Sequence, residues 1–126
     1  MSERFDELKT RMAEVHDLHR ALELLFWDQT VMMPPGGGAV RGQQLTTLDR
    51  IAHQKLVAHE IGELLDGLAD YEQELDYDSD EASLIRTTRR DYEKARRVPA
   101  ELAAEMTGAA AEAHDVWAKA REENDY

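Results

Sequence analysis

The stretch MMPPGGGAVRG, residues 32–42, decides how this chain folds because it separates two long amphipathic patterns. Two consecutive prolines disfavour helix at this point, and the three glycines that follow add no helix propensity. Before this stretch, apolar residues recur every three or four positions, at Phe5, Leu8, Met12, Val15, Leu18, Leu22 and Leu25. This spacing is typical of one face of a helix. We therefore expect a helix that Ser2 caps and that ends by residue 33, and a helix–helix corner at residues 34–38.

A second apolar pattern covers residues 39–69, at Leu45, Leu48, Ile51, Leu56, Ile61, Leu64, Leu65 and Leu68. The spacing fits one long helix as well as two helices with a break near residues 57–59, and both alternatives stay open. Residues 70–80 (DYEQELDYDSD) predict an acidic connector, after which Asp78 and Glu81 are expected to form a capping box.

Pro99 is expected to begin the last helix at its first position. We expect that helix to turn inward the residues Leu102, Met106, Ala109, Ala113, Val116, Trp117 and Ala120. Its nine alanines between residues 100 and 120 predict close approach of a neighbouring helix. No strand-like alternation occurs, so the sequence predicts an all-α fold, an antiparallel bundle of about four to five helices in a single domain over residues 1–126.

The composition excludes several classes of function. With 27 acidic and 15 basic residues the formal net charge is −12, which repels phosphate backbones and argues against a nucleic-acid partner. The absence of cysteine excludes disulfides, thiolate zinc sites and thiol nucleophiles. The longest apolar stretch, near residues 24–27, is too short for a membrane span, and the N-terminus lacks a signal-peptide pattern. We expect a cytoplasmic protein without a membrane partner.

Three local patterns were weighed as metal or phosphate sites. His16, His19 and Glu23 lie on one predicted helix, but a metal site needs further convergent ligands, so exposed histidines are favoured. Residues 59–63 (HEIGE) miss the HExxH motif because the fifth residue is Glu63, and a surface helix is favoured. Residues 34–38 lack the Lys-Ser or Lys-Thr of a phosphate loop. His53 and His114 receive no role, and no Ser-His-Asp arrangement is supported.

Polar residues on the two sides of the corner form the remaining candidate site. These residues are Trp27, Asp28, Met33, Arg41 and Gln44. Arg41 is expected to pair with Asp28 and pin the two helices, because a guanidinium matches a carboxylate in two places. The alternative is that the same cluster lines a ligand groove. The spacing favours the architectural pin, with Trp27 at least partly buried.

Residues 24–48, LLFWDQTVMMPPGGGAVRGQQLTTL, closely resemble the N-terminal signature of the carboxypeptidase Taq family of metallocarboxypeptidases. The signature is an aromatic-Trp-Asp, a Met-Pro, a glycine-rich corner, and Arg and Gln at fixed offsets. Here it is carried by Phe26, Trp27, Asp28, Met33, Pro34, Gly36, Gly37, Gly38, Arg41 and Gln44. Residues 91–95 with 98–102, and residues 117–121 with 124–126, resemble two later blocks of that family. In the last block Tyr126 replaces the usual Phe. The resemblance covers essentially the whole chain.

The resemblance implies a parent protein that removes C-terminal amino acids from peptides with a divalent metal, usually zinc. In such enzymes the metal polarises the scissile carbonyl and a glutamate activates water. The family's HExxH helix and its other functional residues lie beyond residue 126. The resemblance therefore assigns no catalytic residue, no metal ligand and no cofactor to this chain. It implies a cytoplasmic, homodimeric, helical enzyme whose N-terminal helices help to wall the substrate groove.

Two functions follow from these expectations. The first is the N-terminal domain of a larger helical metallopeptidase, inactive alone, whose partners are the remaining catalytic part of the parent chain and the peptide substrate. The second is a stand-alone helical interaction or scaffold module without peptidase activity. No Gly or Pro follows Trp117 to stop the last helix, and this favours the fragment.

Overall fold

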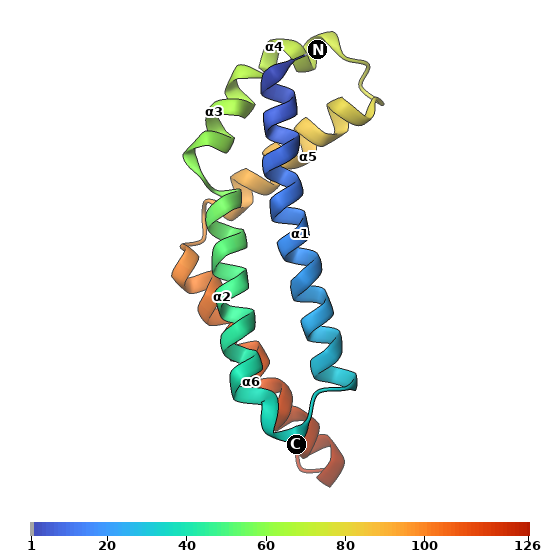
Figure 1. Cartoon of the computed structure of the whole chain (residues 1–126), viewed down its shortest axis with the longest axis vertical. Coiled ribbons are helices and arrows are strands. Elements are labelled where there is room, and N and C mark those ends of the chain that lie inside the picture. Colours follow the sequence, from blue (N-terminus) through green and yellow to red (C-terminus); the bar gives the residue numbers. More distant parts are fainter. Residues whose placement is uncertain (1) are drawn as a thin grey trace.

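A computed structural model describes residues 2–126, which form six α-helices and one 3-10 turn (Figure 1). In chain order they are α1 (Glu3–Val31), η1 (Pro35–Gly37), α2 (Gly38–Leu56), α3 (His59–Gly67), α4 (Ala69–Glu74), α5 (Asp80–Ala95) and α6 (Ala100–Glu123). No strand occurs in this range, so the all-α prediction is confirmed. None of the helices in the described part of the chain is long and apolar enough to cross a bilayer.

Helix α1 begins and ends close to the residues that the sequence predicts. The hydroxyl of Ser2 accepts a hydrogen bond of 3.3 Å from the backbone N–H of Phe5, as expected for an N-cap. At the other end the backbone N–H groups of Met32 and Met33 both donate to the carbonyl of Asp28, at 2.9 and 2.8 Å. Pro34 is extended and η1 follows it, so the predicted corner is confirmed.

Three helices make the lower two-thirds of the molecule in Figure 1. Helices α1 and α2 lie side by side as an antiparallel hairpin, and α6 runs along α2 in the opposite direction. Leu22, Leu45 and Ala111 bring one buried side chain from each helix into a shared core. The antiparallel bundle that the sequence predicts is therefore present.

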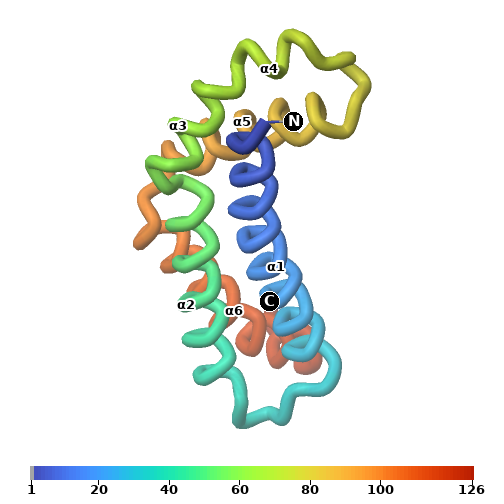
Figure 2. Tube along the Cα trace, turned by 45° about the horizontal axis from the view of Figure 1, so that its top comes forward, coloured from blue at the N-terminus to red at the C-terminus, as the bar shows by residue number. Residues whose placement is uncertain are grey.

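The upper end of the molecule is built by α3, α4 and α5 around the first turns of α1. Figure 2 shows α1 running from this end to the corner. The buried side chains of this second core are Phe5, Leu8, Ile61, Leu64, Leu65, Leu68 and Ile85. Arg89 on α5 also pairs with Glu72 on α4 at 2.7 Å. Because α1 contributes to both cores, it joins the two ends of the fold.

Residues 39–69 form two helices rather than one. Helix α2 ends at Leu56, and Ala58 takes an extended conformation with φ −56° and ψ 142° before α3 begins. This change of direction places Ile61 and Leu64 in the upper core, against the beginning of α1. The break lies within the region that the sequence left open.

The connector expected at residues 70–80 is in part a helix, because α4 occupies residues 69–74. Tyr71 and Leu75 pack against the upper core and hold this segment in place. The expected capping box is also wrong by one residue. The hydroxyl of Ser79, not the carboxylate of Asp78, accepts from the N–H of Ala82 at 3.2 Å. Ser79 is fixed there because its own hydroxyl donates to the carbonyl of Asp76.

The ends of α6 differ slightly from expectation. Pro99 is the N-cap residue rather than the first helical residue. At the other end Asn124 adopts the left-handed conformation with φ 54°, and the N–H of Asp125 donates to the carbonyl of Ala120 at 2.8 Å. With the bond from the N–H of Asn124 to the carbonyl of Arg121 at 3.3 Å, this is a Schellman motif, in which asparagine replaces the more frequent glycine. Asn124 is thus a stop signal for α6, and the prediction that the helix lacks one is wrong.

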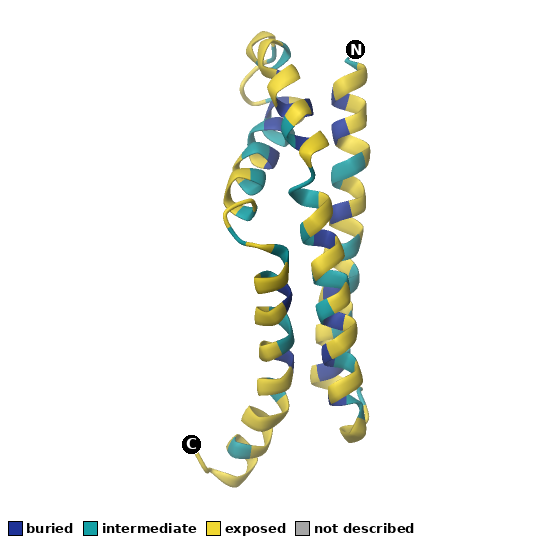
Figure 3. Ribbon diagram, turned by 90° about the vertical axis from the view of Figure 1, so that its left-hand side faces the viewer, coloured by how far each residue is buried: buried dark blue, intermediate teal, exposed yellow. Residues whose placement is uncertain are grey.

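The face of α6 that is buried is not the predicted one. Ala104 and Ala111 are buried, whereas the large residues expected inside keep about half or more of their surface exposed. Figure 3 shows exposed residues covering most of the turns toward the C-terminus. The alanine-rich face allows the close approach to α2 that the sequence predicts, and large side chains would hold the two helices apart. The sequence therefore predicted the close approach of α6 to α2 but assigned the wrong face of α6 to the contact.

Candidate functional site

Arg41 is the centre of the corner between α1 and α2. Its Nη2 lies 2.8 Å from Oδ2 of Asp28, so the expected ion pair is present. Its Nη1 donates to the backbone carbonyl of Leu25 at 2.9 Å, and its Nε donates to Oε1 of Gln44 at 3.2 Å. The Arg41 side chain is 15% exposed and that of Asp28 is 34% exposed. Two guanidinium nitrogens therefore hold α2 against the last turns of α1, and the third bonds to Gln44 one turn along α2 and steadies the Arg41 side chain.

The remaining candidate residues lie at the surface or at the turn. Trp27 keeps 55% of its surface exposed, which is more than the partial burial expected from the sequence suggests. Met33 is half-buried, and its Cγ lies 3.0 Å from the place that a Cβ on Gly37 would occupy. A Cβ at residue 37 would therefore push against the Met33 side chain. The five candidates fix the corner and present Trp27 to the outside, and they do not converge on one cavity.

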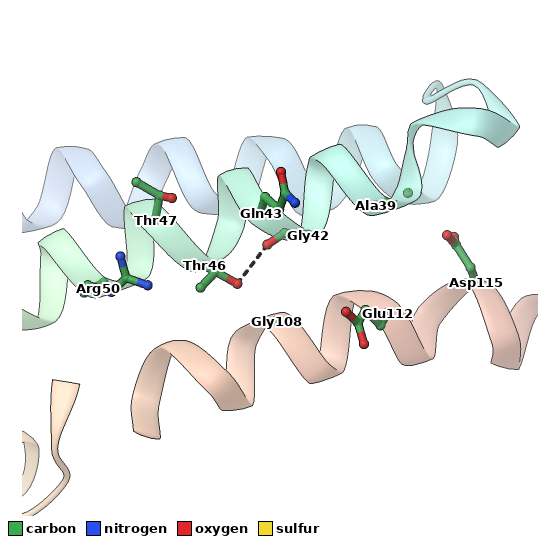
Figure 4. A pocket seen from close by; sticks show the side chains of 10 residues that line it. Ala39, Gly42, Gln43, Thr46, Thr47, Arg50, Gly108, Glu112 and Asp115 are labelled. Atoms are coloured by element: carbon green, nitrogen blue, oxygen red, sulfur yellow. Dashed lines mark hydrogen bonds between the residues drawn. The ribbon is translucent and has the colours of Figure 1, made fainter. Parts of the chain in front are cut away.

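A sizeable cavity lies elsewhere, along the seam between α2 and α6 (Figure 4). It has a volume of about 700 Å³, and its lining combines polar side chains with small residues. The lining side chains include Gln43, Thr46, Thr47 and Arg50 from α2 and Glu112 and Asp115 from α6. The sequence analysis did not find this groove. The sequence feature that could have indicated the groove is the set of small residues in α2 and α6. These residues let the two backbones come close together, and the groove forms along that close contact.

Two glycines in this seam leave no free space for a Cβ. A Cβ on Gly38 would collide with the carboxylate of Asp115, and a Cβ on Gly108 would lie 2.7 Å from Oγ1 of Thr46. That hydroxyl already donates to the carbonyl of Gly42 at 2.8 Å, shown as the dashed line in Figure 4. The groove can hold a polar group, but no side chain in it is paired with a general base in the manner of an activated nucleophile.

Gln29 is an architectural residue that the sequence analysis missed. Its side chain is buried, and its Nε2 donates to the backbone carbonyl of Ala111 at 3.2 Å. The bond ties α1 directly to α6. The sequence feature that could have indicated this role is the position of Gln29. It lies two helical turns after Leu22, where the apolar stripe of α1 continues.

The histidines take ordinary structural roles. His16 accepts a hydrogen bond from Nε of Arg20 at 3.2 Å on the exposed side of α1. His59 pairs with Glu63 one turn later at 2.8 Å, and both are largely exposed. His53 Nε2 lies 2.7 Å from the carbonyl of Val98 and joins α2 to the segment between α5 and α6.

The arrangement of the donor side chains decides whether a metal ion fits. Within residues 2–126 no three or more His, Asp or Glu side chains are grouped so that they fit a metal ion. His16 and His19 share a cavity of about 390 Å³ with Asp91, but the three do not form such a group. The described residues therefore do not fit the zinc ion that the family resemblance implies for the parent protein.

Comparison with known proteins gives a consistent result. The family model described as carboxypeptidase Taq (M32) metallopeptidase matches residues 7–126. Thermostable carboxypeptidase 1 of Thermus thermophilus is 37% identical over 103 residues, which is 82% of this chain and 20% of that protein. The chain thus spans about a fifth of the length of this curated relative. No solved structure matches the chain.

Proposed function

Because the chain belongs to the carboxypeptidase Taq (M32) metallopeptidase family, we propose that it is the helical N-terminal domain, residues 1–126, of a longer carboxypeptidase that removes C-terminal amino acids from peptides. The observation that carries the proposal is the family match over residues 7–126. The relative is about four times as long as this chain, which supports a parent chain whose catalytic part lies outside these residues. The partners of this domain are then that catalytic part and the peptide substrate.

The role of the chain in the parent enzyme is architectural. Arg41 has three of its five N–H donors engaged at the corner and its side chain is mostly buried, so it is poorly placed to hold a substrate carboxylate. Asp28 and Arg41 fix the angle of the hairpin, and Trp27 is displayed at the outside of the same corner. We assign Trp27 to the wall of the substrate groove, with Met33 and Gln44 shaping the turn beside it.

The metal belongs to the part of the parent that follows. Zinc is the expected ion, and it would supply a Lewis acid for the scissile carbonyl. Because the donor groups of residues 2–126 do not fit such an ion, no metal-dependent step is assigned to a residue of this chain. A homodimeric parent enzyme in the cytoplasm completes the proposal.

A chimaera tests this function. In it, the present chain replaces the matching segment of the Thermus thermophilus carboxypeptidase, and release of the C-terminal residue from an N-blocked dipeptide is measured. We expect release that a chelator abolishes and that added zinc restores. A folded chimaera without such release, beside an active Thermus enzyme, contradicts the proposal and favours the scaffold module.

A further inference from the structure

Helix α6 has two faces that differ in residue size. The buried residues Ala104 and Ala111 face the α1–α2 hairpin, and Gly108 on the same side lies against Thr46. Since successive residues in a helix are rotated by about 100°, Leu102 points roughly opposite to these small residues. The helix therefore contacts the hairpin through its small residues and turns its large apolar residues away.

The outward face is a continuous apolar stripe. Its large members are Leu102, Met106, Val116 and Trp117, which are 47%, 62%, 71% and 53% exposed. With Ala109, Ala113 and Ala120 they fall within an arc of about 100° around the helix axis. An arc of this width is what a helix buries when another helix packs on it. We call these seven residues the α6 stripe.

Acidic side chains follow one edge of the α6 stripe. Glu101, Glu105 and Glu112 are exposed and lie beside it at helical spacing. None of the three forms an ion pair with a Lys, Arg or His side chain in residues 2–126. Arg50 lies in the same groove without reaching them. A surface of this kind is complementary to an apolar helix that carries Lys or Arg along one edge.

We propose that the α6 stripe is the surface against which the remaining catalytic part of the parent polypeptide packs, through an apolar helix with basic residues on the edge that meets Glu101, Glu105 and Glu112. The inference rests on the proposed function, because the occupant of the surface is inferred from the greater length of the relative. In the assembled enzyme α6 is then an interior helix, covered on one side by α2 and on the other by the catalytic part.

A second copy of this chain fits the surface less well. A twofold contact between two α6 helices would bring the same acidic edge of each copy close to the other, and like charges repel across such a contact. The formal charge of −12 on each chain adds to that repulsion. The occupant favoured by charge is therefore a segment of different composition.

Thiol labelling measures whether the stripe is covered. The chain contains no cysteine, so a single Val116→Cys substitution gives one reactive group within the α6 stripe. Asp78→Cys, in the exposed segment before α5, is the matched control. Each variant is made in the 126-residue chain and in the chimaera with the Thermus enzyme. The rate of alkylation at that residue is followed by peptide mass spectrometry, and the rate in the isolated chain is compared over a range of protein concentrations.

We expect Cys at residue 116 to react at least about tenfold more slowly in the chimaera than in the isolated chain, and Cys at residue 78 to react at similar rates in both. Equal rates at residue 116, or equal slowing at both residues, overturn the assignment. Slow, concentration-dependent labelling of the isolated chain identifies a second copy as occupant and also overturns it. An active chimaera with an open stripe refutes this inference alone, whereas a protected stripe in an inactive chimaera refutes the proposed function alone.

Discussion

Replacement of Arg41 by alanine removes the contacts that fix the corner, and the structure allows its cost to be worked out. Hydrogen bonds to charged groups contribute about 1.5–3 kcal/mol each when buried, whereas exposed ion pairs contribute about 0–1 kcal/mol. Arg41 is 15% exposed, but its partner Asp28 is 34% exposed and therefore partly screened. The bond to Leu25 is protected and the bond to Gln44 is exposed. We expect Arg41→Ala to lower the free energy of unfolding by about 2 kcal/mol.

Urea unfolding followed by circular dichroism at the helix band measures this loss. With a denaturant slope of about 2 kcal/mol per molar, the midpoint falls by about 1 M. Arg41→Lys keeps the charge but not the fork of donors, so we expect it to lose about half as much. Arg20→Ala is the matched control, because Arg20 pairs with Glu23 at 2.8 Å with both side chains about two-thirds exposed. That control is expected to change stability by less than about 0.5 kcal/mol.

The reasoning is refuted if Arg41→Ala shifts the midpoint no further than Arg20→Ala. A second check is the double-mutant cycle with Asp28→Ala, in which we expect a coupling energy of about 1 kcal/mol. A coupling of zero means that the 2.8 Å contact between Arg41 and Asp28 does not stabilise the hairpin.

Two further substitutions test the contacts of α6. Gly108→Ala is expected to lower stability by about 1 kcal/mol in urea unfolding, because its Cβ displaces Thr46, whereas Gly42→Ala meets an ordinary 3.7 Å contact and is expected to raise stability by up to about 1 kcal/mol. The same sign for both would contradict the close seam. Gln29→Ala is expected to cost about 1–2 kcal/mol in the same assay, since it removes the buried bond to Ala111, and no loss would show that this bond is not needed.

The first half of the fold could be predicted because its signals are local. The period of the apolar residues, the cap at Ser2 and the pair of prolines act within a few residues of one another. The Asp28–Arg41 contact could also be predicted, since a tight corner brings residues that flank it together. The break at residues 57–58 carries no Gly or Pro, so the period alone left it open.

The second half depends on contacts between distant segments. Helix α4 forms in an acidic stretch because Tyr71 and Leu75 find an apolar core made mainly by α1, α3 and α5. The face of α6 was assigned wrongly because the usual rule buries the largest apolar residues. Here a seam lined by Gly42 and Gly108 selects the alanine face instead. The bond from Gln29 to Ala111 was invisible for the same reason, as it depends on where α6 lies.

We propose that this chain supplies architecture to a metallocarboxypeptidase and none of its chemistry. The most direct measurement is the release of C-terminal amino acid from an N-blocked dipeptide by the purified 126-residue chain, with excess zinc or cobalt, beside the chimaera as positive control. We predict no release above the blank for the chain and chelator-sensitive release for the chimaera. Metal-dependent release by the chain alone would contradict the claim, and His16 and His19 would then be the first residues to replace.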